Sequence, residues 1–171
     1  RRQRQMCIRD SLSPITEFTK ATKVAVCNNG LTDISALSGM TQITNLDVSE
    51  NELTDISVLS TLPQLQILSI AGNQISDISS LKGLVELQSL VMSRNSISDI
   101  SAVSEMTKLE KLDVSHNKVQ DISAVSGLTS LRSLNIAYNN VTDLTPLANL
   151  KNVTHLSIIG LSLIHISEPT R

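Results

Sequence analysis

The sequence repeats with a period of 22 residues. Asparagines recur at that spacing, and cutting the chain at them gives six units of equal length between Asn29 and Gly160, without insertion or deletion. A fixed period of this length means that each unit is a small element that buries its apolar side only by stacking on its neighbours. The pattern therefore predicts an elongated solenoid. The asparagine column comprises Asn29, Asn51, Asn73, Asn95, Asn117 and Asn139.

The leucine spacing predicts a short strand in each unit. In ITNLDVSEN, residues 43–51, apolar residues alternate across LDV, which places Leu46 and Val48 on one face of a strand. Stacked in register, such strands form one parallel sheet over a continuous aliphatic core. The expected strands are 24–26, 46–48, 68–70, 90–92, 112–114, 134–136 and 156–158.

Two polar columns have a structural explanation. The asparagine follows the strand, where its amide can both donate to and accept from backbone groups of the turn. We therefore expect Asn95→Ala to destabilise the protein by roughly 1–3 kcal/mol. The aspartate four residues later is typical of an N-cap for a single helical or 3-10 turn. This column comprises Asp33, Asp55, Asp77, Asp99, Asp121 and Asp143.

The aspartate column also raises the question of a calcium site. The Gly-rich nonapeptide of calcium-binding β-rolls does not occur in the sequence, and neither does the spacing of a helix–loop–helix calcium loop. We therefore expect no metal and no cofactor.

The two ends of the chain depart from the repeat. RRQRQMCIRDS, residues 1–11, and LSLIHISEPTR, residues 161–171, resemble the in-frame translation of a pair of sequencing adapters. We therefore expect 1–11 and 161–171 to be non-native segments, which carry no functional argument. The repeat domain is then 12–160, with a partial unit at 12–28 before the six complete units. The alternative is a basic tail and a divergent capping repeat.

Setting the ends aside makes the chain more acidic. They hold five of the 14 basic and two of the 16 acidic residues, so the repeat domain has a net charge of about −5. Such a domain is a poor nucleic-acid binder, because that affinity comes mostly from neutralising phosphates. No apolar run approaches the roughly 18 residues that a membrane span needs, so we expect no membrane insertion in this segment.

The pattern N-x-x-T/S-D-I-S-x-L-x-x-L-x-x-L-x-x-L-x-V resembles the 22-residue leucine-rich repeat. VTDLTPLANLKNVTHLSI, residues 141–158, is especially similar to the internalin-like subclass of bacterial surface proteins. The resemblance implies an α/β fold class: a right-handed horseshoe-shaped solenoid with a parallel sheet on the concave face and 3-10 turns on the convex face. It also implies a protein-recognition module that is secreted or on the cell surface.

Other functions stay open from the sequence. One alternative is a cytoplasmic regulatory scaffold, similar to eukaryotic phosphatase regulators with 22-residue repeats. Another is the recognition domain of a larger enzyme. Catalysis within the chain is not expected, because no phosphate loop, paired-carboxylate cleft or metal-ligand spacing occurs. We predict no catalytic residues.

The outward columns of the strands supply the candidate binding surface. Unlike the core columns, they vary from unit to unit, and they include arginine and tyrosine, which often anchor interfaces. Arg94, His116 and Tyr138 are expected to be neighbours on three successive strands. The alternative is a merely solvated face, and the partner protein and the oligomeric state stay open. The predicted protein-binding residues are Asp47, Ser69, Val91, Arg94, Lys111, Asp113, His116, Asn135 and Tyr138.

Overall fold

The computed structural model describes residues 12, 15 and 17–161. The predicted non-native ends lie outside these residues, except for Leu161. Within the described part, a three-residue strand alternates with a short 3-10 turn. The strands are β1 (Lys23–Ala25), β2 (Asn45–Asp47), β3 (Ile67–Ser69), β4 (Ser89–Val91), β5 (Lys111–Asp113), β6 (Ser133–Asn135) and β7 (His155–Ser157). The turns are η2 (Ser35–Gly39), η3 (Ser57–Thr61), η4 (Ser79–Leu81), η5 (Ser101–Val103), η6 (Ser123–Val125) and η7 (Thr145–Asn149).

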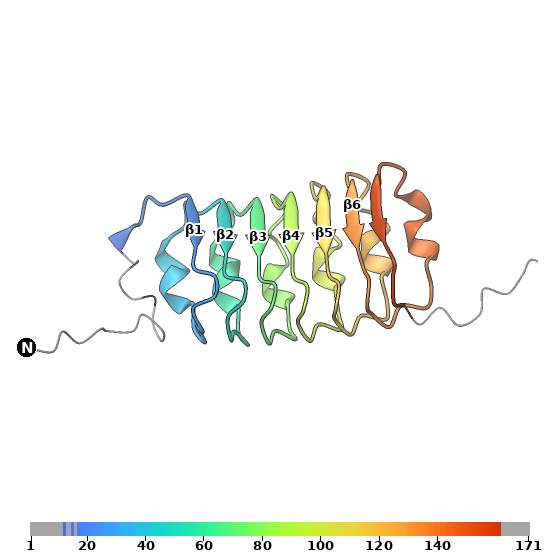
Figure 1. Ribbon diagram of the computed structural model, residues 1–171. Coiled ribbons are helices and arrows are strands. Elements are labelled where there is room, and N and C mark those ends of the chain that lie inside the picture. The colour runs from blue at the N-terminus through green and yellow to red at the C-terminus, as the bar shows by residue number, and fades with distance from the viewer. Residues whose placement is uncertain (1–11, 13–14, 16, 162–171) are drawn as a thin grey trace, which may run out of the picture.

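The seven strands form one parallel sheet in sequence order (Figure 1). Each residue pairs with the one 22 positions further on, as Leu46 does with Leu68. The backbone ladder continues past the strand ends, because the Val48 N–H donates to the Ser69 carbonyl at 2.9 Å. The prediction of seven stacked strands is confirmed, although each begins one residue earlier than expected. A shift of this size lies within the uncertainty of any strand boundary.

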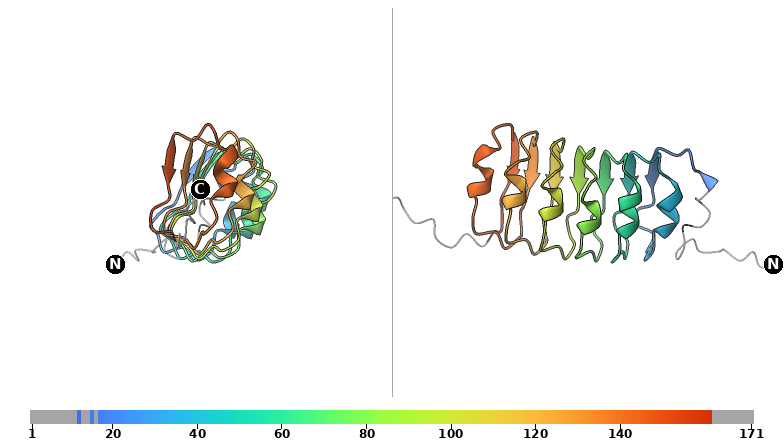
Figure 2. Two further views of the ribbon diagram at one scale, coloured as in Figure 1. Left: turned by 90° about the vertical axis from the view of Figure 1, so that its right-hand side faces the viewer. Right: turned by 180° about the vertical axis from the view of Figure 1, so that it is seen from behind.

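The 3-10 turns lie on the side opposite the sheet. An end-on view shows strands along one side of the coil and turns along the other (Figure 2). In the part of the chain that the structure describes, every helical segment is a 3-10 turn of three to five residues. The predicted solenoid, with a sheet on its concave face and 3-10 turns on its convex face, is thereby confirmed.

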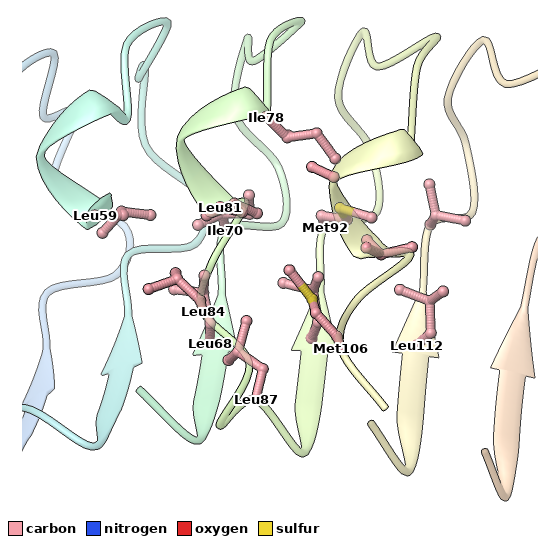
Figure 3. Close-up of a cluster of buried hydrophobic side chains, with 14 of the residues drawn as sticks. Leu59, Leu68, Ile70, Ile78, Leu81, Leu84, Leu87, Met92, Met106 and Leu112 are labelled. Atoms are coloured by element: carbon pink, nitrogen blue, oxygen red, sulfur yellow. The ribbon is translucent and has the colours of Figure 1, made fainter. Parts of the chain in front are cut away.

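The core is a stack of aliphatic layers between sheet and turns (Figure 3). Leu68 on β3 and Leu112 on β5 are fully buried, as is Leu81 from turn η4. Each layer lies between two similar layers, so side chains of matched size fill the space without voids. Leu156 belongs to the same column but is 50% exposed, because it lies on β7, the last strand of the sheet.

The asparagine column joins neighbouring coils. The Asn117 amide nitrogen donates to the carbonyls of Met92 and Val114, both at 3.0 Å, and its oxygen accepts from the Ile97 N–H at 2.9 Å. Asn51, Asn73, Asn95 and Asn139 repeat this arrangement. Asn29 is exposed, and among the described residues its amide donates to the Cys27 carbonyl alone. Each of the five bridging side chains therefore ties together two successive units.

The aspartate column shapes the entry to each 3-10 turn. The Asp77 carboxylate accepts from the Ser79 N–H at 2.8 Å, and the other five aspartates make the same bond two residues on. The N-cap position itself is held by Ile78 and its equivalents. Each aspartate therefore lies one residue before the observed cap and not at it, which corrects the prediction. The reason is that the short carboxylate side chain accepts from the backbone N–H two residues later, which closes an Asx-turn ahead of the 3-10 turn.

Candidate functional site

The concave face displays two residues from each strand. In β5, Lys111 and Asp113 point outward while Leu112 between them is buried, as the alternation of a strand requires. The strand register brings five of the nine predicted residues into one row, because successive members are paired across the sheet. This row is Asp47, Ser69, Val91, Asp113 and Asn135.

Asp113 is fixed within its row. One carboxylate oxygen accepts from the Ser115 N–H at 3.0 Å and from the Ser115 hydroxyl at 2.7 Å. The other accepts from the Asn135 side-chain amide at 3.2 Å. The Asn135 oxygen in turn accepts from the Ala137 N–H at 3.2 Å. Both oxygens of the carboxylate thus have partners inside the protein, and the two side chains are held in place.

A shallow polar hollow lies over β5, β6 and β7. Three predicted residues, Lys111, Asp113 and Asn135, line it together with Ser133, His155 and Ser157. The last three were not predicted as site residues, although their strand positions place them in the same two outward columns. The exact register of the repeat is the signal that could have found them.

Arg94, His116 and Tyr138 do not lie on strands, which corrects the prediction. They follow the strands by three residues and have left-handed φ angles of 55°, 54° and 54°. The residue at this position has a left-handed φ angle in every coil, and Gly72 and Gly160 have φ angles of 64° and 66°. The turn is needed to direct the following asparagine into the core. The two glycines in this column are the signal that sequence reasoning missed, since a left-handed residue is commonly glycine.

The three residues form a rim along one edge of the concave face. The His116 and Tyr138 rings are stacked, with centroids 4.3 Å apart and planes at 16°. Tyr138 is 51% exposed, and its ring lies where a side chain at Gly160 would be, 2.6 Å from the position of a Cβ. Arg94 is exposed on the preceding coil, and its N–H donates to the Ser115 carbonyl at 2.9 Å. The rim therefore presents two stacked rings on successive coils, preceded by the exposed Arg94.

The other half of the concave face has a different character. Asp47 accepts from the N–H and the hydroxyl of Ser49, while Ile67 on the next strand is 45% exposed. Ser69 and Val91 continue the row toward β5. The nine predicted residues therefore divide into Asp47, Ser69 and Val91 on β2 to β4, and a polar group with cations that runs from Arg94, after β4, to Tyr138, after β6.

No group of three or more His, Cys, Asp or Glu residues within 17–161 lies close enough to hold a metal ion. No helix in that part of the chain is both long and apolar enough to cross a membrane. Cys27 is a free, exposed thiol.

Comparison with known proteins agrees with the coil geometry. A family model described as "Leucine Rich repeats (2 copies)" matches residues 41–83, 63–105, 85–128 and 107–149. The chain belongs to the leucine-rich repeat family. A search of curated protein sequences finds no match. Proteins of this family are typically non-enzymatic recognition modules.

Solved structures place the domain near the internalins. It superimposes on an internalin (inlF) from Listeria monocytogenes with a TM-score of 0.87 at 30% identity, covering 89% of this chain and 45% of that one. For internalin C2 (inlC2) of the same organism, the TM-score is 0.83 at 35% identity, over 90% and 66% of the two chains. The leucine-rich repeat domain is thus internalin-like, and it spans about half to two thirds of the length of these internalins.

A plant protein shares the fold. The leucine-rich repeat ectodomain of the membrane receptor kinase GASSHO1/SCHENGEN3 from Arabidopsis thaliana matches with a TM-score of 0.77. Its identity is 24%, over 86% of this chain and 19% of that one. At this identity the likeness concerns the fold alone.

Proposed function

We propose that this domain is a non-enzymatic recognition module that binds a protein partner on its concave face. The observation that carries the proposal is the contrast between inward and outward positions on the same strands. The central position holds leucine in β2 to β7, whereas the position after it holds Asp47, Ser69, Val91, Asp113, Asn135 and Ser157. One scaffold thus presents a different surface on each coil.

The fold is well suited to this role. Neighbouring strands lie about 4.8 Å apart, so the outward side chains form a regular array whose backbone is fixed on both sides. The Asp113–Asn135 hydrogen bond orders part of that array before any partner arrives. Binding to a preorganised surface loses little conformational entropy.

The similar proteins support the same role. One plant relative in fold is described as a peptide hormone receptor, RGFR1, in complex with RGF2. The GASSHO1/SCHENGEN3 ectodomain is described in complex with Casparian strip integrity factor 2. For location, we propose a secreted or cell-surface protein, which rests on the resemblance to the internalin-like subclass. Antibody labelling of intact against permeabilised cells of the source organism tests that location.

A photo-crosslinking experiment tests the binding face. A benzophenone side chain is placed at Ser133, which is half-buried on the concave strand β6, or at Ser126, which is exposed at the convex end of η6. Each labelled domain is irradiated on the surface of candidate host cells. We expect a protein adduct from position 133 that excess unlabelled domain suppresses, and none from position 126. Equal labelling from both positions, or an adduct without competition, would contradict the proposal.

A further inference from the structure

Four basic residues lie on or within three residues of strands β4 to β6, and they fall into two groups. Lys108 pairs with Glu86 at 2.7 Å, and Arg132 pairs with Glu110 at 3.6 Å, each across neighbouring coils. Arg94 on the rim and Lys111 on the concave face are both exposed. Within residues 17–161 neither has a carboxylate within ion-pairing distance. Lys108 and Arg132 are thus paired with a carboxylate on a neighbouring coil, whereas Arg94 and Lys111 are not.

Asp113 offsets one of these two cations, because hydrogen bonds from neutral groups leave its negative charge in place. It is the acidic residue in the outward columns of β4 to β7, and both of its oxygens already accept hydrogen bonds from Ser115 and Asn135. Besides Asp113 and the two cations, the surface holds His116, Tyr138 and His155, which add no negative charge. Hydrogen-bond donors of Lys111, Ser133 and His155 line the hollow beside it.

The local charge runs against that of the whole protein. The chain has a formal net charge of −2, so an excess of cations on one surface is not a consequence of composition. At the other end of the face, Asp47 lies on β2 and Glu50 on the rim. The binding surface is therefore acidic near β2 and basic from β4 to β7. Opposed charges of this kind favour one orientation of a partner.

We propose that the surface formed by Arg94, Lys111, His116, Tyr138 and His155, here called the basic surface, binds an acidic segment of a protein partner. This inference rests on the proposed function, because it takes the concave face as the binding face. Carboxylates of the segment pair with Arg94 and Lys111. An apolar side chain packs on the stacked rings of His116 and Tyr138, of which Tyr138 is the more suitable anchor.

The dimensions set the length of that segment. Arg94 and Tyr138 lie two coils apart, which at about 4.8 Å per coil is roughly 10 Å. An extended chain advances about 3.3–3.6 Å per residue, so about three residues span the distance from Arg94 to Tyr138 along the solenoid axis. A short run with at least two acidic residues and one aromatic residue fits this span.

A peptide titration tests the charge preference. The probes are the acetylated peptides EEYEE and KKYKK, which share their aromatic residue and differ in charge. They are added to the isotopically labelled domain at low ionic strength, where charge interactions are least screened. We expect EEYEE to shift the backbone amide resonances of Arg94, Lys111, His116 and Tyr138, and KKYKK to leave them in place. Equal binding of both peptides, no binding of EEYEE, or shifts spread over the convex face would overturn the inference.

Matched variants separate the basic surface from general charge. Lys111→Ala and Arg94→Ala should each weaken EEYEE binding about two- to fivefold, the range of exposed ion pairs. Lys108→Ala and Arg132→Ala remove the same side chains where they are already paired, and should leave binding unchanged. Equal losses in all four variants would overturn the assignment. Unchanged circular dichroism spectra show that the variants are folded.

Two further experiments test whether the ligand is a protein, and which of the two proposals is wrong if binding differs from expectation. A five-nucleotide single-stranded DNA that binds more tightly than EEYEE would overturn the choice of a protein ligand. If the adduct from position 133 forms but is insensitive to salt and to Lys111→Ala, the proposed function stands and the acidic segment is wrong. If the adduct is lost in Lys111→Ala but kept in Lys108→Ala, both proposals are supported.

Discussion

Replacing Asn117 with alanine tests what holds successive coils together. Its amide makes four hydrogen bonds: the nitrogen donates to the carbonyls of Met92, Val114 and Ser115, and the oxygen accepts from the Ile97 N–H. The side chain is 8% exposed and Ile97 is fully buried. Water therefore has little access to the groups that the substitution would leave unpaired.

The four backbone groups that bond to Asn117 differ in how many hydrogen bonds they keep after the substitution. The Met92 carbonyl also accepts from the Asn95 amide at 3.2 Å, and the Val114 carbonyl from the Asn139 amide at 3.0 Å. The Ser115 carbonyl also accepts from the Arg94 N–H at 2.9 Å. The Ile97 N–H has Asn117 as its acceptor. One buried donor is thus orphaned, which costs about 1–3 kcal/mol, and the weakened carbonyl bonds place the total loss in the upper half of that range.

Urea unfolding followed by far-ultraviolet circular dichroism measures this loss. Asn29→Ala is the control, since Asn29 is exposed and, among the described residues, its side-chain amide donates to the Cys27 carbonyl alone. The bond from its backbone N–H to the Asn51 side-chain oxygen is kept in the variant. We expect the control to change the free energy of unfolding by less than about 0.5 kcal/mol, as surface substitutions do. The slope with urea must match the wild type for the comparison to hold. If the two variants lose equal stability, the bridging role of the asparagines is wrong.

Two further predictions concern the turns. Gly72→Ala places a residue with a Cβ at a left-handed φ angle, and we expect thermal unfolding to show a loss of stability of about 1–2 kcal/mol. Gly127→Ala is the control, because the space around its Cβ is open, and it should leave the stability unchanged. Equal effects of the two substitutions would contradict the backbone strain at residue 72. The hydrogen bond from the Ser79 backbone N–H has the largest effect on Asp77 and lowers its pKa below the ordinary 3.8. A hydrogen bond from the Ser79 side chain lowers this pKa further. The folded state therefore releases the proton more readily than the unfolded one, so the stabilisation is present above pH 3.8 and is lost as pH falls through the lower, folded pKa. The difference in urea midpoint between wild type and Asp77→Asn should shrink over that acidic range, and a difference independent of pH would refute the assignment.

The binding surface shows how far sequence reasoning reached. The row from Asp47 to Asn135 follows from the period alone, because residues 22 apart must be paired in a stacked sheet. The rim does not follow so simply. Arg and Tyr rarely adopt a positive φ, so the identities of residues 94 and 138 conceal the turn in which they lie. The stacking of His116 on Tyr138 and the preference of Asp113 for Asn135 depend on side-chain rotamers, which the period does not specify.

The sequence alone determined the architecture. An exact 22-residue period with constant aliphatic columns leaves a stacked solenoid as the arrangement that buries each unit, and it fixes the number, order and register of the strands. The tertiary structure alone decided which charged groups are paired. Lys108 and Lys111 are three residues apart in sequence, yet one has its carboxylate on the neighbouring coil and the other faces the open surface. Ion pairing depends on side-chain distances between coils, and those exist only once the coils are stacked.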